Sequence, residues 1–390
     1  MKTKYLLKAF CGVALVVSAT SCNDWLKEDA PGKSSPDDYF AQGKAAIQSV
    51  NAAYAPLEWE FNKTYFSEWY IGDIASDDAL KGGENTADDG NAYDIDNFKT
   101  NANNGILLDF YRAQYQGIQR CNLALVEVDG IEPDEAMTAD RKQCLLGELY
   151  YLRAFYYFRL VRIFGGVPYV DKVIDSQKNW RQPRATAEEI YSHIVDDLKQ
   201  AEQLLWNKSQ YADEDLGRAT KGAAQAMLLK AYLYMHDYDN AYEWGKKFFE
   251  DQQSEYNLCP NYADNFTLAG ENGPESVFEI QYMADPTSDY GEGFGFSRGT
   301  FTTILTRSRA ASLGGNKGWG FDRPTQNLYK EFEDGDIRRD VAISKPTDSE
   351  IDGNAELNYL GNVYNNNKTS YCENGIYIAL DHPSRSPLNY

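Results

Sequence analysis

The sequence predicts a mostly helical protein with a helical first part and a loop-rich, partly β second part. Apolar residues recur every three or four positions in long stretches between residues 41 and 258, as on one face of a helix. After Cys259 this periodicity fades, and Asn, Gly, Asp and aromatic residues dominate. The chain of 390 residues is 43% hydrophobic and 14% aromatic, which is ample for a packed core. We therefore expect a helical domain at 41–258 and a loop-rich part at 259–390.

The longest apolar stripe lies between residues 143 and 164. Its members are Leu145, Leu149, Leu152, Tyr156, Leu160 and Ile163. Their spacing of three and four predicts a helix of about six turns. Gly165 and Gly166 end this helix, and Pro168 prevents it from resuming.

A second helix is predicted to begin at Thr186. Thr186 and Glu189 have the spacing of a capping box, in which each side chain accepts a hydrogen bond from the other residue's backbone. The apolar stripe that follows is Ile190, Ile194, Leu198, Ala201 and Leu205. Earlier helices are expected at about 41–59 and 106–128.

Two further helices are expected on either side of a short turn at residues 236–239. Their inward positions are Ala224, Met227, Leu228, Ala231 and Met235, then Ala241, Trp244, Gly245 and Phe248. Helices joined by so short a turn lie antiparallel. Leu228, Tyr232 and Ala241 fit key positions of a tetratricopeptide repeat, so we expect tetratricopeptide-like helical pairs.

The second part contains one alternating segment, at residues 276–283. Phe278, Ile280 and Tyr282 form one face, and Glu279 and Gln281 form the other. This alternation predicts a half-buried strand. Residues 284–320 and 345–390 carry no sustained periodicity and are expected to be loops.

The N-terminus has the pattern of a bacterial export signal. Lys2, Lys4 and Lys8 precede a short apolar stretch at 9–19, and small residues then lead directly to Cys22. This junction resembles a lipobox, so we expect a signal peptide at 1–21, lipidation of Cys22, and a polar tether at 22–40. Ordinary cleavage beside an incidental cysteine is the alternative.

The charge of the chain argues against nucleic-acid binding. The chain has 38 Lys and Arg against 59 Asp and Glu, a net charge of -21. Removing the signal peptide would remove three lysines and make the balance more acidic still. A nucleic-acid duplex would repel such a chain.

The histidines and cysteines predict no metal site and no cofactor. The three histidines, at positions 193, 236 and 382, are widely separated in the sequence. Cys121 and Cys144 lie among apolar residues and are expected to be buried thiols, although export would also permit disulfides. The state of Cys259 and Cys372 stays open.

Several segments resemble, in order, those of the SusD/RagB family of outer-membrane lipoproteins from Bacteroidetes. They are CNDWLKED (22–29), SDDALKGG (76–83), YQGIQRCN (115–122), GELYYLRAFYYFRLVRIFGGVPYV (147–170), RATAEEIYSHIVDDLKQAEQLL (184–205), GRATKGAAQAMLLKAYLYMHDYDNA (217–241), NGPESVFEIQY (272–282) and GWGFDRPTQNLYKEFEDGDIRRD (318–340). The resemblance runs from Cys22 to about Val341. It implies a further helical stretch beyond Tyr390, so we expect the C-terminal part to be truncated.

The resemblance also implies a function. It implies a protein that is lipid-anchored at the outer membrane and faces the extracellular side. Proteins of this family look like lids on a SusC-like TonB-dependent transporter. They capture oligosaccharides, or peptides in some members, and deliver them to the pore. The resemblance therefore implies a binding protein and not an enzyme.

Candidate ligand residues are aromatics in segments rich in Gly and Asn, where a ring is freer to face a ligand. They are Tyr93 and Phe98, then Tyr290, Phe294 and Phe296, and Trp319, with Arg298 and Asp77 as hydrogen-bonding partners. Sugars lay their apolar C–H faces on such rings. By the resemblance, the loop at 91–98 and the Gly-Trp-Gly segment lie near the ligand face. Local packing of each ring is the alternative.

Other functions stay open at this point. A surface glycoside hydrolase would need two carboxylates, and 59 acidic residues cannot exclude such a pair by number alone. A scaffold or adhesin would bind only protein through its helical pairs. The glycines at 291–299 resemble a nucleotide loop without its βαβ unit. The acidic run 213–215 could bind calcium, but we favour a solvated acidic loop, because the spacing of an EF-hand is absent.

Overall fold

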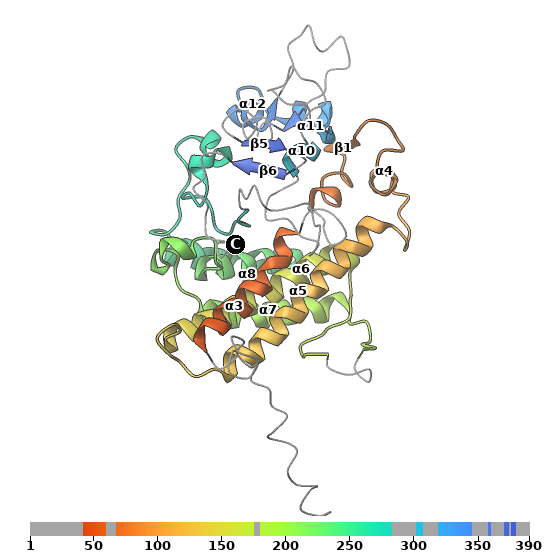
Figure 1. Ribbon diagram of the computed structural model, residues 1–390. Helices are drawn as coiled ribbons and strands as arrows, with labels where there is room; N and C mark the ends of the chain where they lie inside the picture. Colours follow the sequence, from red (N-terminus) through yellow and green to blue (C-terminus); the bar gives the residue numbers. More distant parts are fainter. Residues whose placement is uncertain are drawn as a thin grey trace, which may run out of the picture.

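The computed structural model describes residues 42–59, 68–174, 180–282, 302–306, 319–344, 358–359, 370–373 and 376–379. Figure 1 shows a helical part below and a part with short strands above. The α-helices are α3 (Gly43–Tyr54), α4 (Gly90–Asp96), α5 (Gly105–Gly130), α6 (Ala139–Phe164), α7 (Ala187–Leu204), α8 (Lys221–Tyr234), α9 (Tyr238–Asp251), α10 (Thr302–Thr306), α11 (Gln326–Glu331) and α12 (Ile337–Ala342). No helix within the described ranges is long and apolar enough to cross a membrane.

Successive helices of the helical part pack on one another. α3 contacts α5 and α6. In the series from α5 to α9, α5 contacts α6, α6 contacts α7, α7 contacts α8 and α8 contacts α9. The predicted stripes of α6 and α7 lie in one buried core, including Leu149, Leu160, Ile190 and Leu198, except for Ile163, which is half-buried against a second core. The prediction of a mostly helical protein is confirmed.

The helix ends follow their capping residues. The Thr186 backbone N–H donates to Glu189 Oε2 at 2.8 Å, and the Glu189 N–H donates to Thr186 Oγ1 at 3.2 Å, so the predicted capping box is confirmed. Thr220 caps α8 by accepting from the Ala223 N–H at 3.0 Å. Between α8 and α9 the turn passes through His236, whose φ of 59° is left-handed.

A buried polar network joins α3 to residues much later in the chain. Glu148 of α6 is fully buried and accepts from Arg218 Nη1 at 2.9 Å and from the Tyr54 hydroxyl at 3.0 Å. Arg218 Nη2 also donates to Asn51 Oδ1 at 2.8 Å, and the Ala219 N–H donates to the Tyr54 oxygen at 2.9 Å. Pairing of this kind is what permits ionic groups inside an apolar core.

The cysteines in this core are thiols. Cys121 and Cys144 are buried and unbridged, as predicted, and Cys259 is unbridged and half-buried. Burial raises the pKa of Cys144 to about 12, so its thiol stays protonated at neutral pH.

The upper part is built on short antiparallel pairs of strands. The strands are β1 (Ala79–Gly82), β2 (Phe321–Pro324), β3 (Ile343–Ser344), β4 (Asn358–Tyr359), β5 (Ser370–Glu373) and β6 (Ile376–Ala379). β1 pairs with β2, β3 with β4, and β5 with β6. Short 3₁₀ turns complete the described chain: Ala55–Glu58, Glu68–Tyr70, Lys208–Gln210, Asp213–Asp215, Tyr262–Phe266 and Leu268–Gly270.

The predicted strand at 276–283 is wrong for the part that the structure describes, residues 276–282, which is irregular and pairs with no strand. Phe278 packs edge-on against Tyr151 and Phe155 of α6, with ring centroids 5.1 and 5.6 Å apart. Gln281, predicted to face outward, is buried and exchanges hydrogen bonds with the Asn272 side chain. Packing on a helix therefore satisfies the apolar positions without a sheet.

Two segments predicted as loops contain helices. Residues 91–98 lie largely in α4, which Asp89 caps by accepting from the Ala92 N–H at 3.2 Å. Buried Ala92 and Ile95, three residues apart, give this short helix its apolar side. α10 lies within 284–320.

Candidate functional site

The first component of the candidate site is the β1–β2 ribbon. Gly82 lies opposite Phe321, and the Gly83 N–H donates to the Gly320 carbonyl at 2.7 Å. Gly82 has a φ of 69°, and a Cβ atom there would lie 2.0 Å from the Gly320 oxygen. Only glycine fits this close approach, so the pair of strands brings Trp319 beside the glycines of β1.

A buried lysine holds the loop between β1 and α4. Lys81 Nζ donates to the Asn85 carbonyl at 2.9 Å and to the Asp88 carbonyl. The same ammonium lies 5.3 Å from the centre of the Phe321 ring. Burial lowers the pKa of Lys81, partly opposed by Asp88 and other nearby acids. One cation thus fixes the loop against both strands.

A second hydrophobic core lies beneath the ribbon. Trp69 and Tyr70 stack with ring centroids 3.8 Å apart, and Tyr70 lies 6.3 Å from Phe321. Ala92 and Ile95 of α4, Ile106 and Phe110 of α5, Ile74 and Leu305 complete this core. The N-terminus of α5 is also tied to α4, since the Gly105 N–H donates to Asn91 Oδ1 at 3.1 Å. The ribbon and α4 therefore stand on a packed base.

The structure brings four predicted ligand residues to this one region. Trp319 directly precedes Gly320 and β2, and its side chain is 41% exposed. Phe98 follows α4 with a left-handed φ of 53° and is 77% exposed, while Tyr93 is half-buried on α4 itself. Asp77 is exposed, and its carbonyl accepts from the Thr325 hydroxyl at 3.1 Å. The Asp77 backbone is therefore anchored at the other end of the ribbon.

The remaining predicted site residues lie outside the described part of the chain. They are Cys22, Tyr290, Phe294, Phe296 and Arg298. Their roles stay predictions.

Sequence reasoning missed Asp322, which lies on β2 between Phe321 and Arg323. Its side chain is only 4% exposed, its φ is 51°, and its Oδ1 atom has no hydrogen-bond partner. Burial, and then the nearby Asp73, raise its pKa to about 8. A strained residue that carries a protonated acid marks this ribbon as specialised. No sequence pattern predicts the burial of Asp322, because the elements that cover it are distant in the chain.

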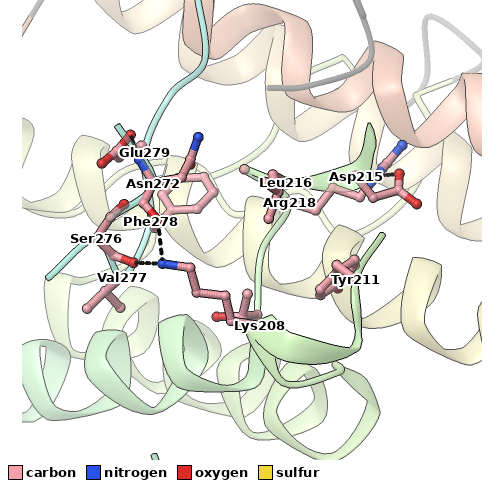
Figure 2. A pocket seen from close by; sticks show the side chains of 12 residues that line it. Lys208, Tyr211, Asp215, Leu216, Arg218, Asn272, Ser276, Val277, Phe278 and Glu279 are labelled. Carbon is pink, nitrogen blue, oxygen red and sulfur yellow. Dashed lines mark hydrogen bonds and ion pairs between the residues drawn. The ribbon is translucent and has the colours of Figure 1, made fainter. Parts of the chain in front are cut away.

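A cavity at the seam between the helical part and residues 272–279 is occupied by its own lining. Figure 2 shows Lys208 reaching from its 3₁₀ turn to the backbone of that segment. Its Nζ donates to the carbonyls of Asn272, Gly273 and Ser276 at 3.0, 2.8 and 3.1 Å. All three ammonium donors are thereby used, so this lysine has a structural role.

The acidic run 213–215 forms a 3₁₀ turn, in which Asp215 pairs with Arg218 and with Arg141. Within the described ranges, no group of three His, Cys, Asp or Glu side chains is arranged to hold a metal ion. The chemistry available at the ribbon is therefore that of exposed rings beside polar groups, which suits recognition of a ligand with both apolar faces and hydroxyls.

The chain has relatives among SusD-like and starch-binding proteins. It is 26% identical over 340 residues to SusD-like protein P2 of Formosa agariphila, covering 85% of this chain and 63% of that protein. It is 26% identical over 220 residues to the starch-binding protein SusD of Bacteroides thetaiotaomicron, covering 52% of this chain and 37% of that protein. The chain thus spans less than two thirds of the length of these relatives.

Solved structures share the fold. A surface glycan-binding protein A from Bacteroides thetaiotaomicron, solved with laminarihexaose, matches with a TM-score of 0.74 at 23% identity, over 87% of this chain and 74% of that one. A laminarin-binding SusD-like protein matches with a TM-score of 0.72 at 23% identity, over 88% and 75%. These matches confirm the predicted fold class. A family model described as "Starch-binding associating with outer membrane" matches residues 24–233, more than half of the chain, and the protein therefore belongs to the SusD-like family.

Proposed function

We propose that this protein captures oligosaccharides at the cell surface and delivers them to a SusC-like TonB-dependent transporter. In this proposal it is a lipoprotein held in the outer membrane through Cys22 and facing outward. The family description supports association with starch and the outer membrane. One structural relative was solved in complex with laminarihexaose, and another is a laminarin-binding protein. Glycan capture, without hydrolysis, is the function that these relationships favour.

The observation that carries the proposal is the exposure of two aromatic residues, Trp319 and Phe98, on segments that the ribbon and α4 bring into one region. Trp319 and Phe98 come from segments more than 200 residues apart, yet β1–β2 pairing and α4 packing bring those segments together. A rigid base beneath exposed rings lowers the entropy cost of binding, because little has to be ordered when a sugar arrives. The acidic and amide groups nearby suit sugar hydroxyls.

Replacing Trp319 with alanine tests the platform. Loss of stacking and of buried ring area amounts to roughly 2–3 kcal/mol, so binding should weaken about 30-fold to 150-fold. Trp319→Phe should recover part of the affinity, because a smaller ring still offers a face. Calorimetric titration against a panel of neutral glycans measures both variants.

Thermal melting is the control for this test. A platform residue should leave the melting temperature nearly unchanged when it is truncated. If Trp319 instead supports the core, truncation should cost about 3–5 kcal/mol of folding free energy, with normal binding by the folded fraction. That outcome would contradict the platform role.

Two further measurements separate the alternatives. Incubation with the same glycans should release no new reducing ends, whereas a glycoside hydrolase would produce them. Gentle solubilisation of native membranes should recover a large β-barrel transporter with the protein, through its helical part at residues 41–252. Binding of peptides, with no binding of any glycan, would instead indicate a peptide-capturing member of the family.

A further inference from the structure

A second groove lies on the flank of the molecule opposite α4. One wall is the C-terminal end of α9, and the other is formed by residues 256–258 and 274–277, which are joined where the Asn257 N–H donates to the Pro274 carbonyl at 2.9 Å. Figure 1 places the blue-green segment that contains these residues on the left flank and α4 on the right. The groove has a volume of about 420 Å³, within the range of ligand pockets. It is therefore separate from the ribbon.

The walls of this groove expose apolar side chains. Phe249 is 74% exposed and Leu258 is 78% exposed, and both line the groove. Phe248 stacks on Tyr256 behind them with ring centroids 5.7 Å apart, which fixes the wall. The groove thus offers an accessible ring and a rigid apolar backing, the arrangement on which a sugar ring or another flat apolar face can lie.

A buried amide supplies the second observation. Gln252 lines the groove and is only 1% exposed. Its Nε2 donates to Asn207 Oδ1 at 3.3 Å, but its Oε1 has no hydrogen-bond partner. An unpaired buried acceptor is unfavourable, because it has lost its hydrogen bonds to water. A hydroxyl of a ligand in the groove would supply the missing donor once the amide turns its oxygen towards the groove, since that oxygen now has almost no exposed surface.

The charges along the groove define the ligand further. Among the described residues that line it there is no lysine or arginine, and Glu275 is the one acidic side chain. Both oxygens of Glu275 are already engaged, by the Cys259 N–H at 2.8 Å and by Asn265 Nδ2 at 2.6 Å. The described lining therefore has no cationic group to attract an anion. Its other polar side chains are the amides of Gln252, Gln253 and Asn257 and the Tyr256 hydroxyl, which is hydrogen-bonded to Thr220 Oγ1 at 2.7 Å.

We propose that this groove is a second carbohydrate site, which takes one or two units of a neutral glycan with a ring on Phe249 and a hydroxyl on Gln252. The inference rests on the proposed function, since it assumes a glycan ligand. Two sites on separate flanks would let one long chain engage the protein twice. Polymers should then bind more tightly than short oligosaccharides, through the high effective concentration of the second contact.

The test uses the full chain with Phe249→Ala, Trp319→Ala and the double variant. Tyr242→Ala is the matched control, because Tyr242 is 67% exposed on the same helix and does not line the groove. The probes are maltohexaose, laminarihexaose and xylohexaose, followed by the polymer of whichever hexasaccharide the wild type binds. Calorimetric titration gives affinity and stoichiometry.

The expected wild-type stoichiometry is two hexasaccharides per chain. Each single variant should retain one site and the double variant none, and Phe249→Ala should weaken polymer binding at least tenfold. Tyr242→Ala should bind like the wild type. Gln252→Leu removes the acceptor oxygen and leaves the Phe249 ring in place, so it should weaken the second site by about fivefold to tenfold. Melting curves should show that Phe249→Ala is folded, as its exposure predicts.

Three results would overturn the inference. A stoichiometry of one, lost in Trp319→Ala and untouched in Phe249→Ala, refutes the second site and leaves the proposed function standing. Failure of the wild type to bind any probe would contradict both the second site and the proposed function. Loss of transporter co-purification in Phe249→Ala, with glycan binding unchanged, would assign the groove to a protein partner instead.

Discussion

Replacing Asp322 with asparagine should change how the stability of the protein depends on pH. The Asp322 carboxyl is buried, lacks a partner for Oδ1, and has a pKa of about 8 against an ordinary value of 3.8. Asparagine has nearly the same shape, cannot ionise, and tolerates the left-handed φ of this position. The substitution therefore isolates the titration of one carboxyl.

The sign of the effect follows from proton binding. Below about pH 4 the carboxyl is protonated in both the folded and the unfolded chain, so it adds no pH dependence. Between pH 4 and pH 8 the unfolded chain releases the proton and the folded chain keeps it. The free energy of unfolding should then fall by about 1.4 kcal/mol per pH unit, or on the order of 4 kcal/mol at pH 7. Above pH 8 the contribution stays constant.

Urea unfolding at pH 4, 5, 6, 7 and 8 measures this slope for the wild type and for Asp322→Asn. Carboxyls that do not interact with Asp322 contribute equally to both proteins, so the difference reports Asp322 together with its interaction with the nearby Asp73. Asparagine leaves a buried amide that costs about 1–3 kcal/mol, and the variant should still gain about 1–3 kcal/mol at pH 7. Asp77→Asn, at the exposed end of the same ribbon, is the control. Equal slopes in the wild type and Asp322→Asn would refute the reasoning.

Three other substitutions test separate features of the chain. Cys22→Ala should move the protein from the membrane fraction to a soluble or uncleaved form, and unchanged detergent partitioning would disprove the anchor. Arg153 donates two hydrogen bonds, of 2.7 and 2.8 Å, to the buried Asp197. Arg153→Met leaves that carboxylate without its partner, so the free energy of unfolding in urea should fall by about 3–5 kcal/mol. The double variant with Asp197→Leu should recover the stability. Gly82→Ala should weaken glycan binding by disturbing the contact with Gly320, while Gly130→Ala, which has open space around it, should not.

The helices could be predicted because their signals are local. The stripe of α7 and its capping pair, Thr186 and Glu189, lie within 20 residues of one another, so a short window contains the complete pattern. The tetratricopeptide-like pair α8–α9 likewise depends on near neighbours. The segment of α4 carries a local signal of the same kind, a capping residue at Asp89 and apolar residues at Ala92 and Ile95. We predicted a loop there because Asn, Asp and Gly surround these residues.

The ribbon and the groove could not be predicted in this way. β1 and β2 have four residues each and lie about 240 residues apart, and neither segment specifies the other. Apolar and polar residues do alternate at 276–282, but a strand also needs a second strand to pair with. Phe278 instead packs against Tyr151 of α6. Burial of Asp322 and Gln252 depends on several distant elements at once. Trp319 and Phe98 were found by composition and resemblance, and their role awaits the binding test.

The network around Glu148 has a consequence for the order of folding. A chain emerges from the ribosome N-terminus first, so α3 is made long before Arg218 and Ala219, which are 165 or more positions away from the α3 groups they bond. Until those residues arrive, Asn51 lacks the Arg218 guanidinium and Tyr54 lacks the Ala219 N–H, although Tyr54 can already bond Glu148. The long loop that must close before these bonds form favours late docking of α3. A nascent chain halted before residue 218 should thus expose α3 to proteases and chaperones, although every residue of that helix is already present.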